Sequence, residues 1–138
     1  MPRAPELTRP ETVNVAAGIL RDAEGRVLLS DRAQATSLQD HWEFPGGKIR
    51  AGESAADALR RELAEELGIQ IAKPEFFCTT RHDYEEFRVA IDFYLVTGWQ
   101  GSPTGVEGQS LRWVGVDELA SAGLLPADEP LIRLLKEL

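Results

Sequence analysis

The 138-residue sequence contains a single cysteine, Cys78, and few basic residues, and each scarcity removes a class of protein. One cysteine excludes an intrachain disulfide framework and a zinc site built from cysteines. Lysine and arginine number 15 against 23 aspartates and glutamates, which gives a formal net charge of −8. This acidic excess argues against binding to a nucleic acid polymer or to an anionic membrane, because both need basic patches.

Long apolar runs are also missing from the sequence. None approaches the ~20 consecutive apolar residues that a membrane-spanning helix needs. Residues 1–11 contain three prolines and mixed charges in place of the apolar centre of a signal peptide. We therefore expect a cytoplasmic protein with no membrane partner.

No internal repeat, low-complexity tract or linker divides the chain, and its length is that of one domain. Hydrophobic residues make up 43% and charged residues 28%, which is close to average globular usage and sufficient for a core. We expect a flexible N-terminal arm at residues 1–11 and a single domain at residues 12–138.

Apolar and β-branched runs separated by turn residues predict the order of the elements. Residues 22–25 form a predicted turn that joins the first two strands into a hairpin, and Pro45, Gly46 and Gly47 are expected to end the third strand. We expect strands over residues 12–20, 26–30, 42–44, 75–82, 88–99 and 111–116, and helices over residues 54–67, 117–122 and 129–138. This order predicts an α+β domain in which helices pack on a mixed sheet.

The helix predicted over residues 54–67 carries the strongest local signals. Ser54 is a suitable N-cap residue, and Gly68 stands where a helix often ends in left-handed backbone. Leu59, Leu63 and Leu67 recur at helical spacing and give the helix an apolar face.

Three glutamates, Glu62, Glu65 and Glu66, lie on this helix. At about 100° per residue their carboxylates gather on one side, next to the leucine face. Glu53 comes just before the helix and can reach back over its first turn. Oxygen clusters of this kind suit Mg²⁺ or Mn²⁺.

A solvated acidic face supported by Arg60 and Arg61 is the ordinary alternative for such glutamates. Three features favour a metal site instead. A glycine loop directly precedes the helix and lets a ligand approach the backbone closely. Glu53 adds a fourth acid, and Arg61 stands where it can orient a carboxylate.

These residues fill the pattern Gly-x5-Glu-x7-Arg-Glu-U-x-Glu-Glu-x-Gly-U, in which U is apolar. The pattern is the Nudix box, and a chance match to its seven fixed residue types is on the order of 10⁻⁸ per starting position. The nine matching residues are Gly47, Glu53, Arg61, Glu62, Leu63, Glu65, Glu66, Gly68 and Ile69. The sequence therefore resembles the Nudix hydrolases.

The resemblance extends over most of the chain. Residues 42–49, 93–96, 107–109 and 126–130 are similar in order and spacing to the MutT branch, the oxidised-nucleotide pyrophosphatases. This implies the Nudix fold, an α/β/α sandwich with a mixed sheet between helices. It also implies Mg²⁺-dependent hydrolysis of a nucleoside triphosphate to a monophosphate and pyrophosphate, with 8-oxo-dGTP as the expected substrate.

The resemblance also assigns a metal site. Glu62, Glu65 and Glu66 would hold Mg²⁺, the backbone carbonyl of Gly46 would join them, and Glu107 in the loop at residues 101–109 matches an acid that completes the set. Mn²⁺ could replace Mg²⁺. Glu62 and Glu107 are both candidates for the general base.

The other catalytic and phosphate-binding roles follow from the same resemblance. Glu53 is expected to help position the metal or the water, and Arg61 to orient the glutamates. Gly46, Gly47 and Lys48 are candidate substrate-binding residues, although an exposed loop lysine can equally be solvated.

For the nucleoside, Arg32, Glu43, Phe44, Tyr84 and Asp128 match positions that line the base and sugar pocket. The MutT-type enzyme for oxidised guanine has asparagine where this chain has Asp128, and the cytidine-nucleotide enzymes have aspartate. An ionised aspartate only accepts hydrogen bonds, but a protonated one could imitate the amide if burial raised its pKa.

Three alternatives stay open at this point. The enzyme could prefer cytidine or modified pyrimidine triphosphates. It could act on ADP-ribose or dinucleoside polyphosphates, although the resemblance outside the box favours simple triphosphates. The domain could instead be a non-catalytic nucleotide-sensing module, although such modules often lose box glutamates and none is missing here. We expect a monomer or a homodimer.

Overall fold

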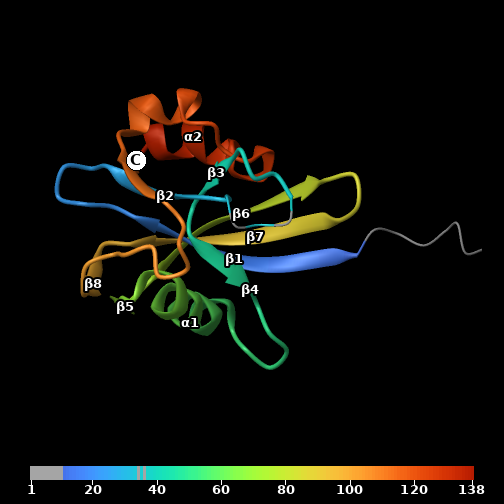
Figure 1. Cartoon of the computed structure of the whole chain (residues 1–138), viewed down its shortest axis with the longest axis horizontal. Coiled ribbons are helices and arrows are strands. Elements are labelled where there is room, and N and C mark those ends of the chain that lie inside the picture. The colour runs from blue at the N-terminus through green and yellow to red at the C-terminus, as the bar shows by residue number, and fades with distance from the viewer. Residues whose placement is uncertain (1–10, 34, 36) are drawn as a thin grey trace, which may run out of the picture.

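A computed structural model describes residues 11–33, 35 and 37–138, and a four-stranded sheet runs through its centre (Figure 1). The strand order is β4 (Gly46–Lys48), β1 (Thr12–Leu20), β7 (Arg88–Val96) and β6 (Glu75–Asp83). β1 runs parallel to β7 and antiparallel to β4, and β6 is antiparallel to β7. The predicted mixed sheet is therefore confirmed.

The predicted hairpin between the first two strands is wrong. β2 (Val27–Asp31) pairs with β3 (Trp42–Glu43) and β9 (Leu111–Val114) in a separate three-stranded sheet, and only one bridge, Arg21 to Val27, joins it to the end of β1. β7 pairs along the whole of one edge of β1 and β4 pairs with the other edge at residues 15–17, so β2 leaves β1 directly after the turn. A local turn signal cannot reveal this competition.

The chain departs from the predicted elements at four other places. The strand expected over residues 88–99 divides into β7 and β8 (Gly98–Gln100), and β8 pairs with an unpredicted strand, β5 (Gln70–Ala72). The Pro-Gly-Gly stop after β3 is followed at once by β4. The expected helix at residues 117–122 is the 3₁₀ helix η2 (Val116–Ser121). The last helix is α2 (Pro130–Lys136), preceded by the 3₁₀ helix η3 (Pro126–Asp128).

Helix α1 (Ala55–Leu67) forms as its sequence predicts. The Ser54 hydroxyl accepts a hydrogen bond from the Asp57 backbone N–H at 3.1 Å. Gly68 ends the helix at φ 70°, and its N–H donates to the Ala64 carbonyl. Leu59, Leu63 and Leu67 are fully buried against the sheet.

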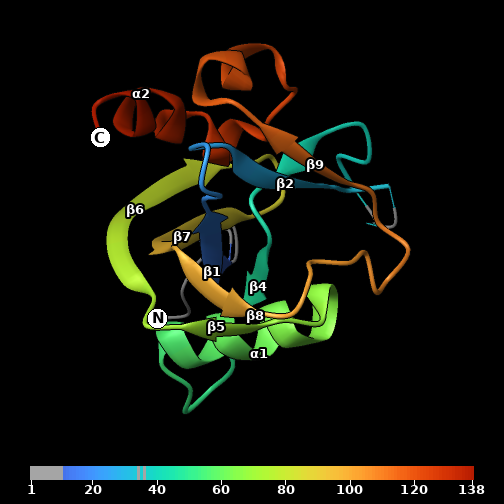
Figure 2. The same ribbon diagram turned by 90° about the vertical axis from the view of Figure 1, so that its left-hand side faces the viewer.

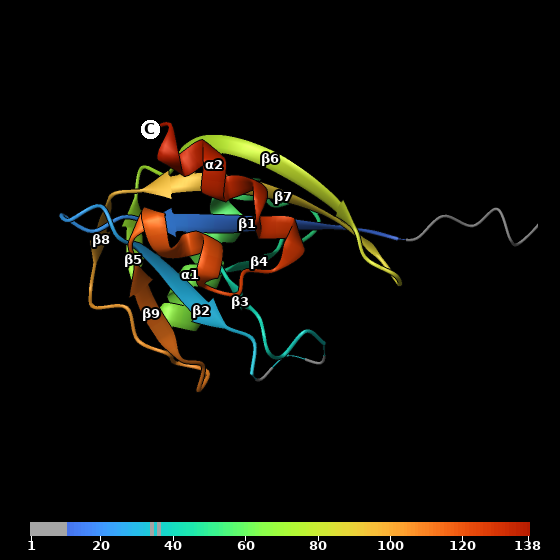
Figure 3. The same cartoon turned by 90° about the horizontal axis from the view of Figure 1, so that it is seen from above.

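Two cores lie on opposite faces of the central sheet, and β1 contributes to both. Ala16 and Leu20 pack on the side of α1, whereas Ala17 and Ile19 pack on the side of η2, η3 and α2. Figures 1 and 2 show α1 on one side of the sheet and α2 on the other, and Figure 3 shows α2 lying over the strands. The predicted α/β/α sandwich is therefore confirmed.

The N-terminal arm was expected at residues 1–11, and residues 1–10 lie outside the described residues. Within the described part of the chain, none of the helices combines the length and the apolar character that a membrane crossing requires.

Candidate active site

Arg61 lies at the centre of an ion-pair network on α1. Its Nε and Nη2 atoms donate to the two carboxylate oxygens of Glu53 at 2.8 and 2.9 Å. Nη1 donates to Oε1 of Glu62 at 2.8 Å and lies 3.5 Å from Oε2 of Glu65, and Nη2 also donates to the Lys48 carbonyl at 3.0 Å. One guanidinium thus joins three acids of the box to β4.

The network changes the acidity of its members. The side-chain hydrogen bonds from Arg61, helped by the Arg50 backbone N–H, lower the pKa of Glu53 to about 2. Hydrogen bonds to Glu53 and Glu62 raise the pKa of Arg61. Glu53 therefore stays ionised at neutral pH and holds the guanidinium that aligns the other acids.

Gly47 allows Glu62 to lie directly against β4. A Cβ atom at position 47 would overlap the carboxylate of Glu62, and one at position 46 would overlap the backbone of Ala16 and Ala17 on β1. Only residues without a side chain fit at these two positions. The glycine pair therefore brings α1, β4 and β1 together at the candidate site.

Glu66 is the acid whose ionisation costs most. Burial, the hydrogen bond with Glu62 and the charges of Glu62, Glu107 and Glu43 raise its pKa to about 9. The carboxyl groups of these four glutamates repel one another when they are ionised. This is the environment that a bound cation would relieve.

The loop at residues 101–110 covers the C-terminal end of α1 and carries Glu107. The Val106 N–H donates to the Glu66 carbonyl at 3.1 Å, and the Thr104 N–H donates to the Leu67 carbonyl at 3.0 Å. These bonds satisfy helix-end carbonyls that have no partner within the helix. The loop is thus fixed to the helix that bears the other acids.

Gln109 fixes the position of Glu107 within this loop. Its side-chain Nε2 donates to the Glu66 carbonyl at 2.9 Å, and its Oε1 accepts from the Glu107 backbone N–H at 2.9 Å. One amide therefore ties the backbone of Glu107 to that of Glu66. Sequence analysis assigned Gln109 no role, and its place next to Glu107 in the MutT-like segment was the only signal.

The acids fit a hard divalent cation in chemistry but do not form a finished cage. Their donor atoms are carboxylate oxygens, the ligands that Mg²⁺ and Mn²⁺ prefer. Within residues 11–33, 35 and 37–138, no three His, Cys, Asp or Glu side chains converge closely enough to hold a metal ion. Arg61 binds one oxygen of the Glu62 carboxylate. A bound cation would therefore have to draw the acids closer together than they lie here.

Two cavities meet beside these acids. One of about 190 Å³ has an acidic lining that includes Asp31, Glu66 and Glu107. The other, of about 370 Å³, lies against β4 and has apolar walls; its lining includes Val13, Val15, Leu38, Gly46, Gly47, Lys48, Tyr84, Phe87, Val89, Ile91, Leu125 and Ala127. Arg32 and Glu43 line both cavities.

The boundary between the cavities is an ion pair. Nη1 of Arg32 donates to both carboxylate oxygens of Glu43, at 2.8 and 3.2 Å, and Nε and Nη2 of Arg32 donate to the Ser37 carbonyl. Burial raises the pKa of Glu43 despite the opposing effect of Arg32. Arg32 thus connects the loop before β3, through Ser37, to Glu43 in the shared lining of the two cavities.

Asp128 lies next to the apolar cavity, directly after its lining residue Ala127. It is 2% exposed, and its Oδ2 accepts from the Phe44 backbone N–H at 3.0 Å. Burial raises the pKa of Asp128 to about 8, with a further contribution from the charge of Glu43. At neutral pH this carboxyl group is therefore mainly protonated and can donate a hydrogen bond as well as accept one.

Six of the eight residues predicted to bind the substrate lie around one cavity. Arg32, Glu43, Gly46, Gly47, Lys48 and Tyr84 line the apolar cavity. Phe44 and Asp128 do not line it and are buried beside residues that do. Arg61 lies in the middle of α1 and Glu53 lies just before the helix, as the sequence predicted.

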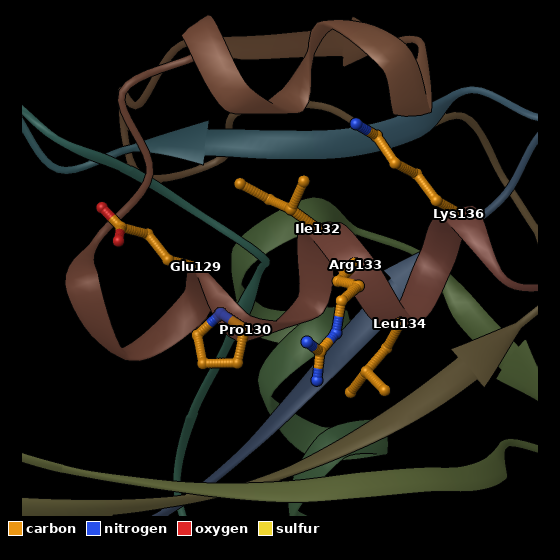
Figure 4. A pocket seen from close by; sticks show the side chains of 6 residues that line it. All are labelled: Glu129, Pro130, Ile132, Arg133, Leu134 and Lys136. Carbon is orange, nitrogen blue, oxygen red and sulfur yellow. The ribbon is translucent and has the colours of Figure 1, made fainter.

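A larger cavity of about 460 Å³ lies along α2 (Figure 4). Its charged lining residues are Glu129, Arg133 and Lys136. In Figure 4 the side chains of Arg133 and Lys136 extend on different sides of the helix and do not converge on one point. This cavity has no cluster of acids and no glycine loop, so the pair of cavities beside α1 is the better candidate.

Known proteins are similar to this chain in sequence and in fold. A model of the NUDIX domain matches residues 16–134. The chain belongs to the NUDIX domain family. This confirms the Nudix resemblance predicted from the box residues, and the relatives below confirm the MutT-type resemblance predicted from the segments outside the box.

The most informative Nudix relatives cover nearly the whole chain. An 8-oxo-dGTP diphosphatase of Haemophilus influenzae is 40% identical over 126 residues, which are 91% of this chain and 93% of that protein. A CTP pyrophosphohydrolase of Escherichia coli is 32% identical and spans 88% of this chain and 89% of its own length. The crystal structure of a MutT Nudix hydrolase from Burkholderia pseudomallei superimposes with a TM-score of 0.80 at 26% identity, covering 89% and 97% of the two chains.

These relatives establish the protein as a Nudix hydrolase of nucleotide pyrophosphohydrolase type. Nudix hydrolases generally need a divalent metal, and the oxygen donors beside α1 suit one. The predicted hydrolase class is confirmed. The base, the metal and the role of each residue belong to the proposal that follows.

Proposed function

We propose that this Nudix hydrolase converts nucleoside triphosphates into monophosphates and pyrophosphate with Mg²⁺, and that 8-oxo-dGTP is its preferred substrate. The observation that carries the proposal is the pair of cavities joined at Arg32 and Glu43. An acidic cavity suits metal-bound phosphates, and an adjacent apolar cavity suits a base. Free nucleotides in the cytoplasm are the expected substrates, and nucleic acid polymers are not.

We assign the metal to Glu62, Glu65, Glu66, Glu107 and the carbonyl oxygen of Gly46. When bound, Mg²⁺ neutralises phosphate charge and orients the attacking water. Glu53 keeps Arg61 in place, and Arg61 holds Glu62 against Gly47. Lys48 lines the apolar cavity at the end of β4, where its ammonium group can meet a phosphate oxygen.

Glu107 is the better candidate for the general base. Its carboxylate accepts no hydrogen bond from the described residues, whereas Glu62 accepts one from Arg61. A ligand of the metal can act as base only through a carboxylate oxygen that the metal does not take, and a strong hydrogen-bond donor on that oxygen would lower its basicity. Glu107 also lines the acidic cavity together with Glu66.

A neutral Asp128 is compatible with a preference for an oxidised guanine. A neutral carboxyl group can donate and accept, as the amide of asparagine does, so aspartate at this position is compatible with a guanine edge. The H. influenzae relative named for 8-oxo-dGTP is also more similar to this chain than the CTP relative is.

The second candidate is a pyrophosphatase for cytidine or modified pyrimidine triphosphates. Two observations favour it: the CTP pyrophosphohydrolase relative at 32% identity and the aspartate at position 128. A non-catalytic nucleotide-sensing module is disfavoured because all the box glutamates are present and Glu62 and Glu66 lie in contact.

One assay separates these candidates. Pyrophosphate release is measured with Mg²⁺ for 8-oxo-dGTP, dGTP, CTP and 5-methyl-dCTP, and kcat/KM is compared. We expect the highest kcat/KM for 8-oxo-dGTP; a higher value for a cytidine nucleotide would favour the second candidate. Absence of release from every triphosphate would contradict both.

A variant pair tests the metal assignment. Glu66→Gln removes a carboxylate from the acidic cavity, and we expect turnover to fall at least 100-fold. Glu75→Gln makes the same change of charge at an exposed position at the start of β6 and should leave turnover unchanged. Full activity in Glu66→Gln would refute the proposed site.

A further inference from the structure

Two side chains hold the peptide groups of Ala127 on η3. The Ala127 backbone N–H donates to the Tyr84 hydroxyl at 3.1 Å. On the other side of the residue, the Thr80 hydroxyl donates to the Ala127 carbonyl at 3.0 Å, in a buried position. Thr80 lies on β6 and Tyr84 directly follows it, so one strand end binds both polar groups of a single residue.

A third hydrogen bond reaches η3 from a different element. The Phe44 N–H, between β3 and β4, donates to Oδ2 of Asp128. A three-residue 3₁₀ helix cannot fix its own position, because it contains too few internal hydrogen bonds. Its placement therefore depends on links to other elements: those to Thr80, Tyr84 and Phe44, and the hydrogen bond from the N–H of Leu125, its N-cap residue, to the Trp42 carbonyl at 2.9 Å.

The ring of Tyr84 is itself held in place. Its centroid lies 4.6 Å from that of His82 at an interplanar angle of 61°, and 5.1 Å from that of Phe87 at 31°. The Tyr84 N–H also donates to the Phe87 carbonyl at 2.8 Å, which closes the turn between β6 and β7. These contacts fix the ring of Tyr84 and therefore the position of its hydroxyl group.

The η3 segment, which these hydrogen bonds hold, forms one wall of the apolar cavity. Leu125 and Ala127 both line that cavity, and Asp128 follows them. A shift of a wall by about 1 Å is sufficient to change how well a site fits one substrate. A wall fixed by hydrogen bonds from several elements distinguishes substrates of similar shape better than a wall that can adjust.

We propose that Thr80 and Tyr84 are positioning residues that set base selectivity by fixing the η3 wall. The inference rests on the proposed function, because it takes the apolar cavity to be the base site. Neither side chain is asked to take part in hydrolysis. Removing either hydroxyl should therefore weaken discrimination between bases while the phosphate chemistry continues.

The test uses two variants that remove one hydroxyl each. Thr80→Val keeps a β-branched residue on the strand, and Tyr84→Phe keeps the aromatic ring. We expect the ratio of kcat/KM between the preferred and the non-preferred triphosphate to fall roughly 10-fold in each variant, which corresponds to one lost hydrogen bond. The loss should lie in KM, and kcat of Thr80→Val for the preferred substrate should stay within about 3-fold, because Thr80 does not line the cavity.

Two matched controls make the same chemical changes elsewhere. Thr79→Val removes an exposed hydroxyl on β6 that donates to Asp92. Tyr94→Phe removes a hydroxyl on β7 that lies outside the lining of both cavities beside α1. Both controls should keep the selectivity of the unmodified enzyme; loss of selectivity in them would overturn the inference.

Amide hydrogen exchange supplies a readout that does not depend on activity. The Ala127 amide should exchange faster in Tyr84→Phe, because its acceptor is gone. If exchange accelerates and selectivity is unchanged, or if kcat falls equally for every base, the inference is wrong. An unmodified enzyme that releases no pyrophosphate would instead contradict the proposed function, and the inference with it.

Discussion

The side of the site built on α1 and the side built on η3 are assembled from different ranges of the sequence. On the α1 side, Arg61 contacts Glu62, its neighbour in the chain, and Glu53, eight positions away. On the η3 side, hydrogen bonds join residues 43, 47 and 84 positions apart. The network around Arg61 is thus a local construction, whereas the Glu107 loop on the same side and the whole selectivity side depend on the completed fold.

The two sides also differ in charge. The α1 side holds several carboxylates and one guanidinium in partly exposed positions, with side-chain exposures of 17–18% for Glu53, Arg61 and Glu62. The η3 side holds hydroxyl groups, backbone groups and Asp128, which is 2% exposed and mainly protonated at neutral pH. Changes on the α1 side should therefore affect turnover, and those on the η3 side should affect substrate choice and the pH dependence of stability.

The largest expected effect comes from closing the space between β4 and α1. Gly47→Ala would place a methyl group on the Glu62 carboxylate and displace it, so we expect kcat/KM to fall by at least 100-fold. Gly98→Ala is the matched control, because its Cβ would lie 3.9 Å from the nearest atom, Cβ of Ala72. Steady-state pyrophosphate release measures both. Equal activity in the two variants would refute the close fit of Gly47 and Glu62.

The next largest effect concerns stability on the η3 side. The pKa of Asp128 is raised from 3.8 to about 8, so the unfolded chain ionises first and native stability falls as pH rises between these values. The slope reaches at most ~1.4 kcal/mol per pH unit for one group. The asparagine in Asp128→Asn cannot ionise, so this variant should not lose that stability. The free energy of unfolding of the variant should therefore rise relative to that of the unmodified protein from pH 4 to pH 8.

Urea unfolding at pH 4, 6 and 8 measures this difference. Asp83→Asn is a suitable control, because Asp83 is exposed and its pKa is lowered by Arg88 instead of raised. A constant difference in stability between Asp128→Asn and the unmodified protein across this range would show that Asp128 is ionised in the folded state.

A smaller effect is expected at the loop that carries Glu107. Gln109→Leu removes the amide that ties the Glu107 backbone to the Glu66 carbonyl, so the apparent affinity for the divalent cation should fall roughly 10-fold. Direct Mn²⁺ titration followed by electron paramagnetic resonance gives a readout separate from turnover. Gln100→Leu, on the exposed end of β8, is the control. Unchanged Mn²⁺ affinity in Gln109→Leu would contradict the positioning role of Gln109.

The smallest effect belongs to the ion pair of Glu53. Its folded pKa is depressed to about 2, so its stabilisation is present above the ordinary value of 4.5 and is lost as pH falls toward 2. Glu53→Gln should therefore unfold with a weaker dependence on pH between 4.5 and 2 than the unmodified protein. Circular dichroism during acid titration measures this. A steeper dependence in the variant would be the opposite of the expected sign.

The contrast between the two sides explains what the sequence could predict. The box residues from Gly47 to Ile69 are close in the chain, and a helix fixes their relative positions by its period alone. The N-cap Ser54, the apolar face and the Gly68 terminus followed from the same local rules. The helix and its acids were therefore predictable.

The pairing of strands and the wall at η3 were not predictable in this way. The turn at residues 22–25 is present, but β7 pairs along the whole of one edge of β1 and β4 pairs with part of the other, so β2 leaves β1 directly after the turn. The roles of Thr80 and Gln109 arise from contacts with residues 47 and 43 positions away. No spacing rule links such positions, because only the folded sheet brings them together.

The parallel pairing of β1 with β7 has a consequence for folding. It joins residue 12 to residue 88 and residue 20 to residue 96, so the whole box segment lies inside the stretch of chain that this pairing closes. The helix with its acids can form in microseconds, whereas non-local strand pairing belongs to the millisecond-to-second range. During refolding, the ion pairs of α1 should therefore return well before the base cavity, and substrate choice should be the last property that the molecule recovers.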